Sequence, residues 1–164
     1  MRSLGLDVGG KRTGVAVSDP NGILATPLTV LAGKDEDVLI KEVLKLVEQY
    51  QTERIVVGLP RNLNGELGLQ ANKVTAFADK LSIRINQINL NKVDVQLWDE
   101  RFSTKAAERL KVDTGGRRNK LRNREKRRVK NYSFSAKSEV DAIAAAFILQ
   151  SFLDSHRLSN NEGA

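Results

Sequence analysis

Three acidic sites, far apart in the sequence, have the residue types and settings of a metal-ion centre. Asp7 lies in a short apolar stretch near the start of the chain, and Asp141 interrupts an alanine-rich helical pattern. Between them, Asp99 and Glu100 follow another apolar stretch. Asp is a poor helix former, and a carboxylate among apolar neighbours is costly unless another charge compensates it. Because carboxylate and water oxygens suit Mg²⁺ or Mn²⁺, these acids predict a site for a hard divalent cation.

Each acid also has a simpler explanation when it is taken singly. Asp7 could be a polar residue beside a turn, and Asp141 could lie on the solvent side of its helix. Either Asp99 or Glu100 could pair with the adjacent Arg101. The metal-site hypothesis therefore depends on the fold bringing the three sites together.

The first of these acids lies within "GLDVGGKRTG", residues 5–14, which is close to the phosphate-binding P-loop pattern. A P-loop needs a strand before its first glycine and a Ser or Thr after its lysine. Only four residues precede Gly5, and Arg12 follows Lys11. The stretch is better interpreted as a strand that carries Asp7, followed by a glycine turn that a nucleic-acid backbone can approach closely.

Positive charge is concentrated in one segment. Residues 111–130 hold ten Lys/Arg and two acids, a net charge of +8, whereas the other 144 residues hold 17 basic and 18 acidic residues, a net charge of −1. Concentrated positive charge favours polyanions, and the absence of aromatic residues from this segment favours backbone contacts over base stacking. The alternative is a solvated charged loop. The predicted nucleic-acid contacts are Lys11, Arg12, Arg117, Arg118, Lys120, Arg122, Arg124, Lys126, Arg127 and Arg128.

The elements that must position these residues follow from hydrophobic periodicity and turn signals. Strands are predicted at residues 3–8, 13–18, 27–31, 54–60 and 93–98, and helices at 35–50, 69–89, 103–111 and 137–154. A basic mobile loop is expected at 113–136 and a frayed tail at 155–164, so that residues 1–154 form a single domain. Three N-terminal antiparallel strands followed by alternating helices and strands predict an α/β fold, with helices on the faces of a mixed sheet.

Composition excludes several classes of protein. The chain has 164 residues and no cysteine, which rules out disulfides and thiolate metal sites. It has no apolar run of the roughly 20 residues needed to cross a bilayer and no signal-peptide pattern. We therefore expect a cytoplasmic protein with no membrane partner.

Four sequence blocks, in order, resemble the YqgF family, whose members are Holliday-junction-resolvase-like nucleases of the 16S ribosomal RNA precursor. The resemblance covers roughly residues 3–154, and the blocks are "GLDVGGKRTGVAVSD", "VVGLPRNLNGELG", "WDERFST" and "VDAIAAAFILQSFL". It implies a ribonuclease H-like fold with a five-stranded mixed sheet. It also implies an acidic Mg²⁺ or Mn²⁺ site and a hydrolase that matures the 5′ end of the small-subunit ribosomal RNA, in ribosome biogenesis.

The resemblance implies catalytic and metal-binding roles for Asp7, Glu100 and Asp141. Glu100 is preferred to Asp99 because an acid points inward at this strand end in the family and Glu reaches further. The chain departs from the family at Asn64-Gly65, where Asp-Gly is usual, and in the length of its basic segment.

Three other functions remain open at this stage. A sugar-kinase or actin-like ATPase opens with a similar Asp-x-Gly strand and turn but needs two such domains, and 164 residues supply one. The protein could instead be a non-catalytic RNA-binding factor in ribosome assembly, or a resolvase that cuts four-way DNA junctions. The expected partners are accordingly precursor ribosomal RNA or a ribosomal particle, or else branched DNA, bound by a monomer or weak homodimer.

Overall fold

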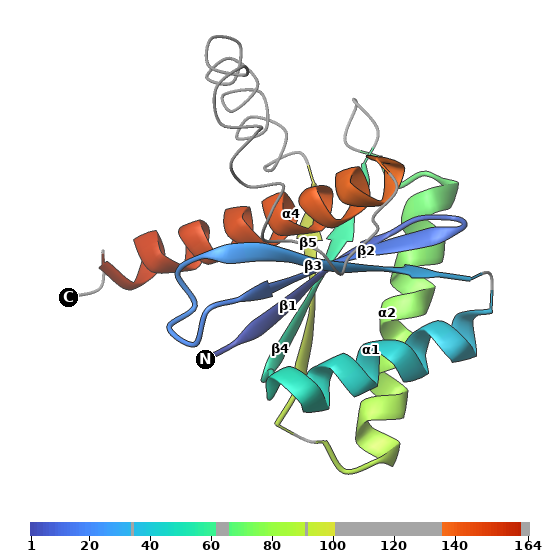
Figure 1. The fold of residues 1–164 in the computed structure, drawn as a ribbon, viewed down its shortest axis with the longest axis horizontal. Coiled ribbons are helices and arrows are strands. Elements are labelled where there is room, and N and C mark those ends of the chain that lie inside the picture. Colours follow the sequence, from blue (N-terminus) through green and yellow to red (C-terminus); the bar gives the residue numbers. More distant parts are fainter. Residues whose placement is uncertain (34, 62–65, 91, 101–135, 162–164) are drawn as a thin grey trace, which may run out of the picture.

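Five strands form one mixed sheet in the order β3-β2-β1-β4-β5 (Figure 1). β1 (Ser3–Val8), β2 (Arg12–Ser18) and β3 (Ala25–Ala32) are antiparallel neighbours, whereas β4 (Arg54–Leu59) and β5 (Asp94–Asp99) run parallel to β1. The computed structural model describes residues 1–33, 35–61, 66–90, 92–100 and 136–161. The predicted helix 103–111 and nearly all of the basic loop 113–136 lie outside these ranges.

The glycine-containing stretch at the start of the chain is a β-hairpin. The Gly9 N–H donates to the Arg12 carbonyl oxygen at 2.9 Å and closes the turn between β1 and β2. After β2, the carboxylate of Asp19 accepts hydrogen bonds from the backbone N–H groups of Ile23 and Leu24 at 2.6 and 2.8 Å. Strand, tight turn and strand confirm the sequence-based preference over a P-loop, which would require a helix after the glycines.

Two helices cover one face of the sheet. α1 (Glu36–Tyr50) begins after Asp35, whose side chain caps it by accepting from the N–H groups of Asp37 and Val38. α2 (Leu69–Gln87) packs beside it. The buried residues of α1 are Ile40, Val43, Leu44 and Val47, and those of α2 include Val74, Phe77, Ala78, Leu81 and Ile85.

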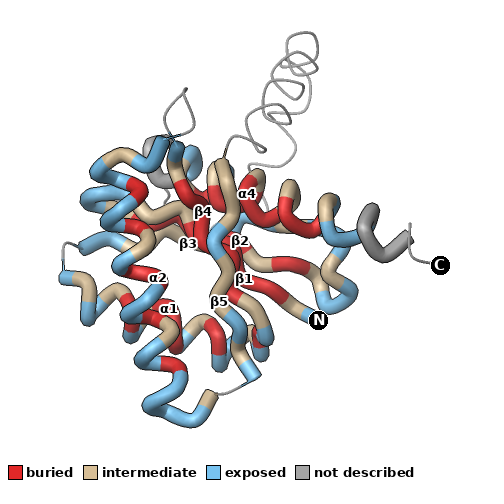
Figure 2. Tube along the Cα trace, turned by 180° about the vertical axis from the view of Figure 1, so that it is seen from behind, coloured by how far each residue is buried: buried red, intermediate tan, exposed pale blue. Residues whose placement is uncertain are grey.

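The third helix, α4 (Ala136–Asn161), crosses the opposite face of the sheet (Figure 1). Buried residues run along the central strands and along the side of α4 that meets them (Figure 2). Val56 of β4 packs toward α4, while its neighbours Ile55 and Val57 pack toward α1 and α2, so this strand is buried on both faces. Among the described residues, no helix has both the length and the apolar character to cross a membrane.

α4 lies unusually close to the sheet because glycines replace side chains beneath it. A Cβ atom added to Gly5 would lie 2.7 Å from Leu149 Cβ and 2.9 Å from the Ala145 carbonyl oxygen. A Cβ atom added to Gly14 would overlap the carbonyl oxygen of Asp141. These positions on β1 and β2 therefore fix how near the start of α4 can come to the strands.

The sequence-based end of this helix, at residue 154, is wrong. Residues 155–161, assigned from the sequence to a frayed tail, continue α4. The His156 ring lies on the Phe152 ring with centroids 4.0 Å apart, and its Nδ1 atom is 3.0 Å from the Phe152 carbonyl oxygen. This packing on a buried aromatic residue, together with the absence of Gly and Pro before residue 162, explains why the helix continues.

Replacement of Gly14 by alanine is expected to lower the free energy of unfolding by about 3 kcal/mol, the upper end for an overpacked core, because a backbone atom of α4 blocks the new methyl group. Urea unfolding of the purified variant measures this change. Gly10→Ala is the matched control, because no atom lies within 4 Å of a Cβ atom built there. Equal stabilities for the two variants would contradict this account of α4 packing.

Candidate metal and nucleic-acid site

Asp7 lies on the face of β1 that meets α4. Successive side chains of a strand alternate between faces, and Gly5, two residues earlier, contacts α4. Asp7 pairs in register with Gly14 of β2, the residue that contacts the Asp141 backbone. The first and third of the predicted acidic sites are therefore neighbours across the interface between sheet and helix.

Glu100 follows β5 directly and reaches the same face. Its backbone N–H donates to the Leu59 carbonyl oxygen at 3.2 Å, which continues the pairing with β4. Its carboxylate lies over Gly58, where an added Cβ atom would be 2.9 Å from Glu100 Oε1. Because Gly58 has no side chain, the Glu100 carboxylate and Ile148 of α4 can both lie over β4, the strand between β1 and β5.

Asp141 of α4 is paired with a cation. The Nε atom of Arg12, at the start of β2, lies 2.9 Å from Asp141 Oδ2. That oxygen is shielded from solvent and has no partner with hydrogen-bond geometry, so the contact is ionic without an aligned N–H. The Arg12 side chain is 40% exposed and that of Asp141 is 29% exposed. Arg12 was expected to contact phosphates, and its pairing with Asp141 was not predicted.

Asp7 lies within electrostatic reach of both Asp141 and Glu100. Burial, and then the negative charge of Asp141, raise the pKa of Asp7. Burial, followed by the charges of Asp7 and Asp99, raises the pKa of Glu100 to about 7. A nearby cation would relieve this repulsion.

Asp99 has a different setting from that of Glu100. Its Oδ2 atom lies 3.2 Å from Arg61 Nε, and its side chain is only 13% exposed. As the last residue of β5, it points away from the face to which Glu100 contributes. The geometry is therefore consistent with the preference for Glu100 over Asp99 as the acid in the cluster.

A divalent cation fits the residues of this cluster. Asp7, Glu100 and Asp141 supply the hard oxygen donors that Mg²⁺ and Mn²⁺ prefer, and Asp141 Oδ2 is a buried oxygen without a hydrogen bond. Within the described ranges, no three acidic, histidine or cysteine side chains are gathered tightly enough to chelate an ion as they stand. Asp141 is held by Arg12 instead.

The predicted nucleic-acid contacts are only partly described. Lys11 is exposed at the hairpin turn, and Arg12 is next to it. The remaining predicted contacts lie outside the described residues: Arg117, Arg118, Lys120, Arg122, Arg124, Lys126, Arg127 and Arg128.

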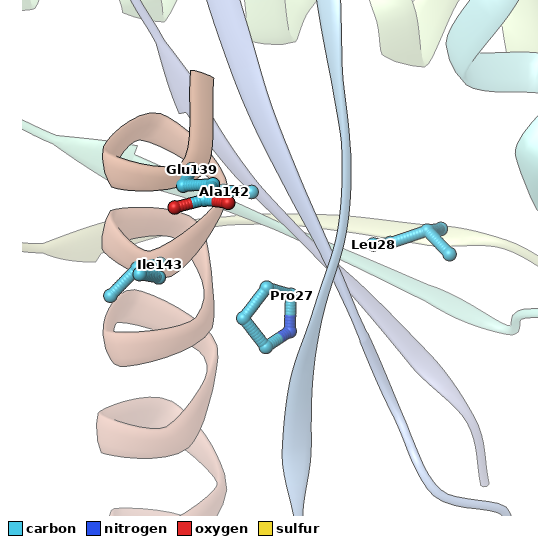
Figure 3. Close-up of a pocket in the computed structure, with 5 residues that line it drawn as sticks. All are labelled: Pro27, Leu28, Glu139, Ala142 and Ile143. Atoms are coloured by element: carbon cyan, nitrogen blue, oxygen red, sulfur yellow. The ribbon is translucent and has the colours of Figure 1, made fainter. Parts of the chain in front are cut away.

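Two hollows in the surface lie beside the cluster without containing its carboxylates. One, of about 230 Å³, is mainly apolar and lies between β3 and α4 (Figure 3), where it is lined by Pro27, Leu28, Glu139, Ala142 and Ile143. The other, of about 360 Å³, lies on the side of α1 and α2, and its lining includes Gly9, Gly10, Gln70, Lys73 and Phe77.

Comparison with known proteins identifies close relatives over the whole chain. Residues 1–155 match the sequence family described as "RuvX: Holliday junction resolvase". A protein of Desulforudis audaxviator (strain MP104C) is 38% identical over 161 residues, which cover 98% of this chain and 99% of the relative. A protein of Clostridium acetobutylicum is 39% identical over 155 residues, covering 94% and 99%. Both carry the name "Putative pre-16S rRNA nuclease".

Solved structures share the fold at low sequence identity. A structure titled "T. thermophilus RuvC in complex with Holliday junction substrate" matches with a TM-score of 0.57 at 15% identity, over 95% of this chain and 96% of that one. The yeast mitochondrial Holliday junction resolvase Ydc2 matches with a TM-score of 0.55 at 14% identity, over 92% and 77%. This likeness confirms the expected ribonuclease H-like fold.

The raised pKa of Glu100 predicts that the protein, kept in EDTA, loses stability as pH rises from about 4.5 to about 7. In this window the folded state binds more protons than the unfolded state, so the free energy of unfolding falls with pH. Glu100→Gln should flatten this dependence and be more stable than wild type at pH 8, in urea unfolding between pH 4.5 and 8. Glu48→Gln, on the exposed surface of α1, is the control. The assignment fails if Glu100→Gln keeps the wild-type slope.

Proposed function

The chain belongs to the RuvX (YqgF) family, and from this premise we propose that it is a metal-dependent endonuclease that matures the 5′ end of 16S ribosomal RNA. As a nuclease it is a hydrolase acting on phosphodiester bonds, with nucleic acid as its partner. Precursor ribosomal RNA, free or in a ribosomal particle, is the proposed substrate, because the relatives at 38% and 39% identity are named as pre-16S rRNA nucleases. The proposed place of action is the cytoplasm.

One observation carries the assignment of the active site to this chain's own residues. Asp7 from β1, Glu100 from the end of β5 and Asp141 from α4 share one face of the sheet, and the charge of Asp141 raises the pKa of Asp7 while that of Asp7 raises the pKa of Glu100. Acids that serve only surface solubility spread apart and face solvent, whereas this cluster is partly buried and repulsive. Such an arrangement is costly for folding, and it is typical of functional sites.

In the proposed mechanism, Asp7 on the central strand would hold divalent cations together with Glu100 and Asp141. When bound, such cations lower the pKa of a water nucleophile and stabilise the charge on the leaving oxygen. The glycine turn after β1 leaves room for a sugar-phosphate backbone beside Asp7. Lys11, exposed on that turn, and the basic residues of segment 111–130 are the proposed phosphate contacts.

A second candidate substrate is four-way DNA. The family description and the titles of the two solved structures above all refer to Holliday junctions. The same carboxylates would cleave either backbone, because hydrolysis of a phosphodiester does not depend on the sugar. A resolvase must cut two strands, so this alternative also requires two copies of the chain on one junction.

The proposal predicts that Asp7→Asn lowers metal-dependent cleavage below about 1% of wild type. Mutation of a residue that only hydrogen-bonds to a metal ligand typically lowers activity by about 10- to 100-fold, and loss of the ligand itself should lower it further. The assay uses labelled RNA spanning the 5′ leader of the 16S precursor, with Mn²⁺, Mg²⁺ or EDTA, and a four-way DNA junction as a parallel substrate. Asp154→Asn, an exposed position on α4, is the matched control and should cleave as wild type does.

The outcomes separate the candidate functions. Cleavage of RNA alone, lost in Asp7→Asn, supports the proposed substrate, whereas cleavage of the junction alone supports the resolvase. Tight RNA binding with no cleavage by wild type would favour the non-catalytic assembly factor. Unchanged cleavage by Asp7→Asn would show that the active site lies elsewhere.

A further inference from the structure

The ion pair between Arg12 and Asp141 joins a residue of the glycine-turn hairpin to a proposed metal ligand. The Nε atom of Arg12 is 2.9 Å from Asp141 Oδ2, and that oxygen has no hydrogen-bond partner. Arg12 is on the same face of β2 as Gly14, two residues later, so its side chain is directed toward α4 by the strand itself. Its position at the site is therefore built into the sheet.

A guanidinium and a divalent cation compete for this carboxylate. Both are attracted to the negative charge of Asp141, and they repel each other at the few ångströms that separate groups sharing one carboxylate. A cation held jointly by Asp7, Glu100 and Asp141 would therefore favour withdrawal of the guanidinium. The Arg12 side chain can move away from Asp141 into solvent, because it is 40% exposed and begins beside the hairpin turn that carries Lys11.

A withdrawn Arg12 would be well suited to bind substrate. The guanidinium fork matches the oxygens of a phosphate in geometry and charge. Beside Lys11 it would lie at the mouth of the site, where the backbone of the nucleic acid must pass to reach the carboxylates. The same side chain thus has two alternative anionic partners, one from the protein and one from the substrate.

We propose that Arg12 neutralises Asp141 until a divalent cation replaces it, and that the released guanidinium then binds a phosphate of the nucleic-acid substrate. Arg12 is then a positioning residue that makes metal binding and substrate binding mutually favourable, since coupling between two ligands is reciprocal. This inference rests on the proposed function, because it requires Asp141 to be a metal ligand.

The first test measures Mn²⁺ binding by calorimetry, without nucleic acid, in wild type, Arg12→Gln and Arg12→Lys. Arg12→Gln removes the guanidinium that competes with Mn²⁺ for Asp141. This variant should therefore bind Mn²⁺ at least about fivefold more tightly than wild type, which is the lower end of the affinity changes typical of coupled sites. It should also gain more in Tm on addition of Mn²⁺, because Asp141 is left uncompensated without the ion. Arg12→Lys keeps a positive charge and should bind Mn²⁺ more weakly than Arg12→Gln.

Arg54→Gln is the matched control for loss of an ion-paired arginine. Arg54 lies 4.0 Å from Asp94, and it begins β4, at the opposite end of that strand from Gly58 and the carboxylates. Its Mn²⁺ affinity should remain within about twofold of wild type.

The second test measures binding of a phosphorothioate RNA that resists cleavage, with Mn²⁺ and with EDTA. Mn²⁺ should strengthen RNA binding in wild type by a larger factor than in Arg12→Gln, with Arg12→Lys in between. If wild type binds no Mn²⁺, both the proposed metal site and this inference fail. If wild type binds Mn²⁺ but Arg12→Gln binds it equally or more weakly, Arg12 only orients Asp141, and this inference alone is overturned.

Discussion

The contact between α4 and the glycine-bearing face of the sheet determines the rest of the candidate site. At Gly5 and Gly14 the helix backbone occupies space that side chains would otherwise fill. This close approach brings Asp141 level with Asp7 on β1 and brings the side of α4 that carries Ile148 over Gly58 and Glu100. A helix one side chain further from the strands would leave the carboxylates separated by solvent, and their charges would then hardly interact.

That proximity has an electrostatic cost, and the surrounding structure offsets it. Asp7 and Glu100 are partly buried and repel each other, so each is harder to ionise than an exposed acid. Two apolar cores hold the arrangement in place, one beneath α1 and α2 and the other beneath α4. Arg12 supplies a compensating positive charge at Asp141. Apolar packing thus holds carboxylates together although their charges repel each other, and local strain of this kind is common at catalytic centres.

Local patterns in the sequence predict most of the architecture. The alternation and glycine turn of residues 3–18 correspond to the β1–β2 hairpin, and the apolar run at Ile55 to Val57 corresponds to a strand buried on both faces. The clustering of Asp7, Glu100 and Asp141 follows from element order and the family resemblance. The Arg12–Asp141 pair could not be predicted, because it depends on the distance between helix and sheet, which no local pattern encodes. The end of α4 was missed because the His156–Phe152 contact depends on tertiary packing of Phe152.

The packing of α4 against β1 and β2 also has a consequence for synthesis of the protein on the ribosome. Asp7 lies on β1, the first strand in chain order, but the helix that carries Asp141 is made only after the whole sheet. Packing of α4 on β1 is slow to form, because the whole chain between these two elements must first close into a loop. A chain translated only as far as β5 therefore lacks both the helix that covers the opposite face of the sheet and a complete acidic cluster. The acidic cluster is in this way completed only once α4 has been synthesised.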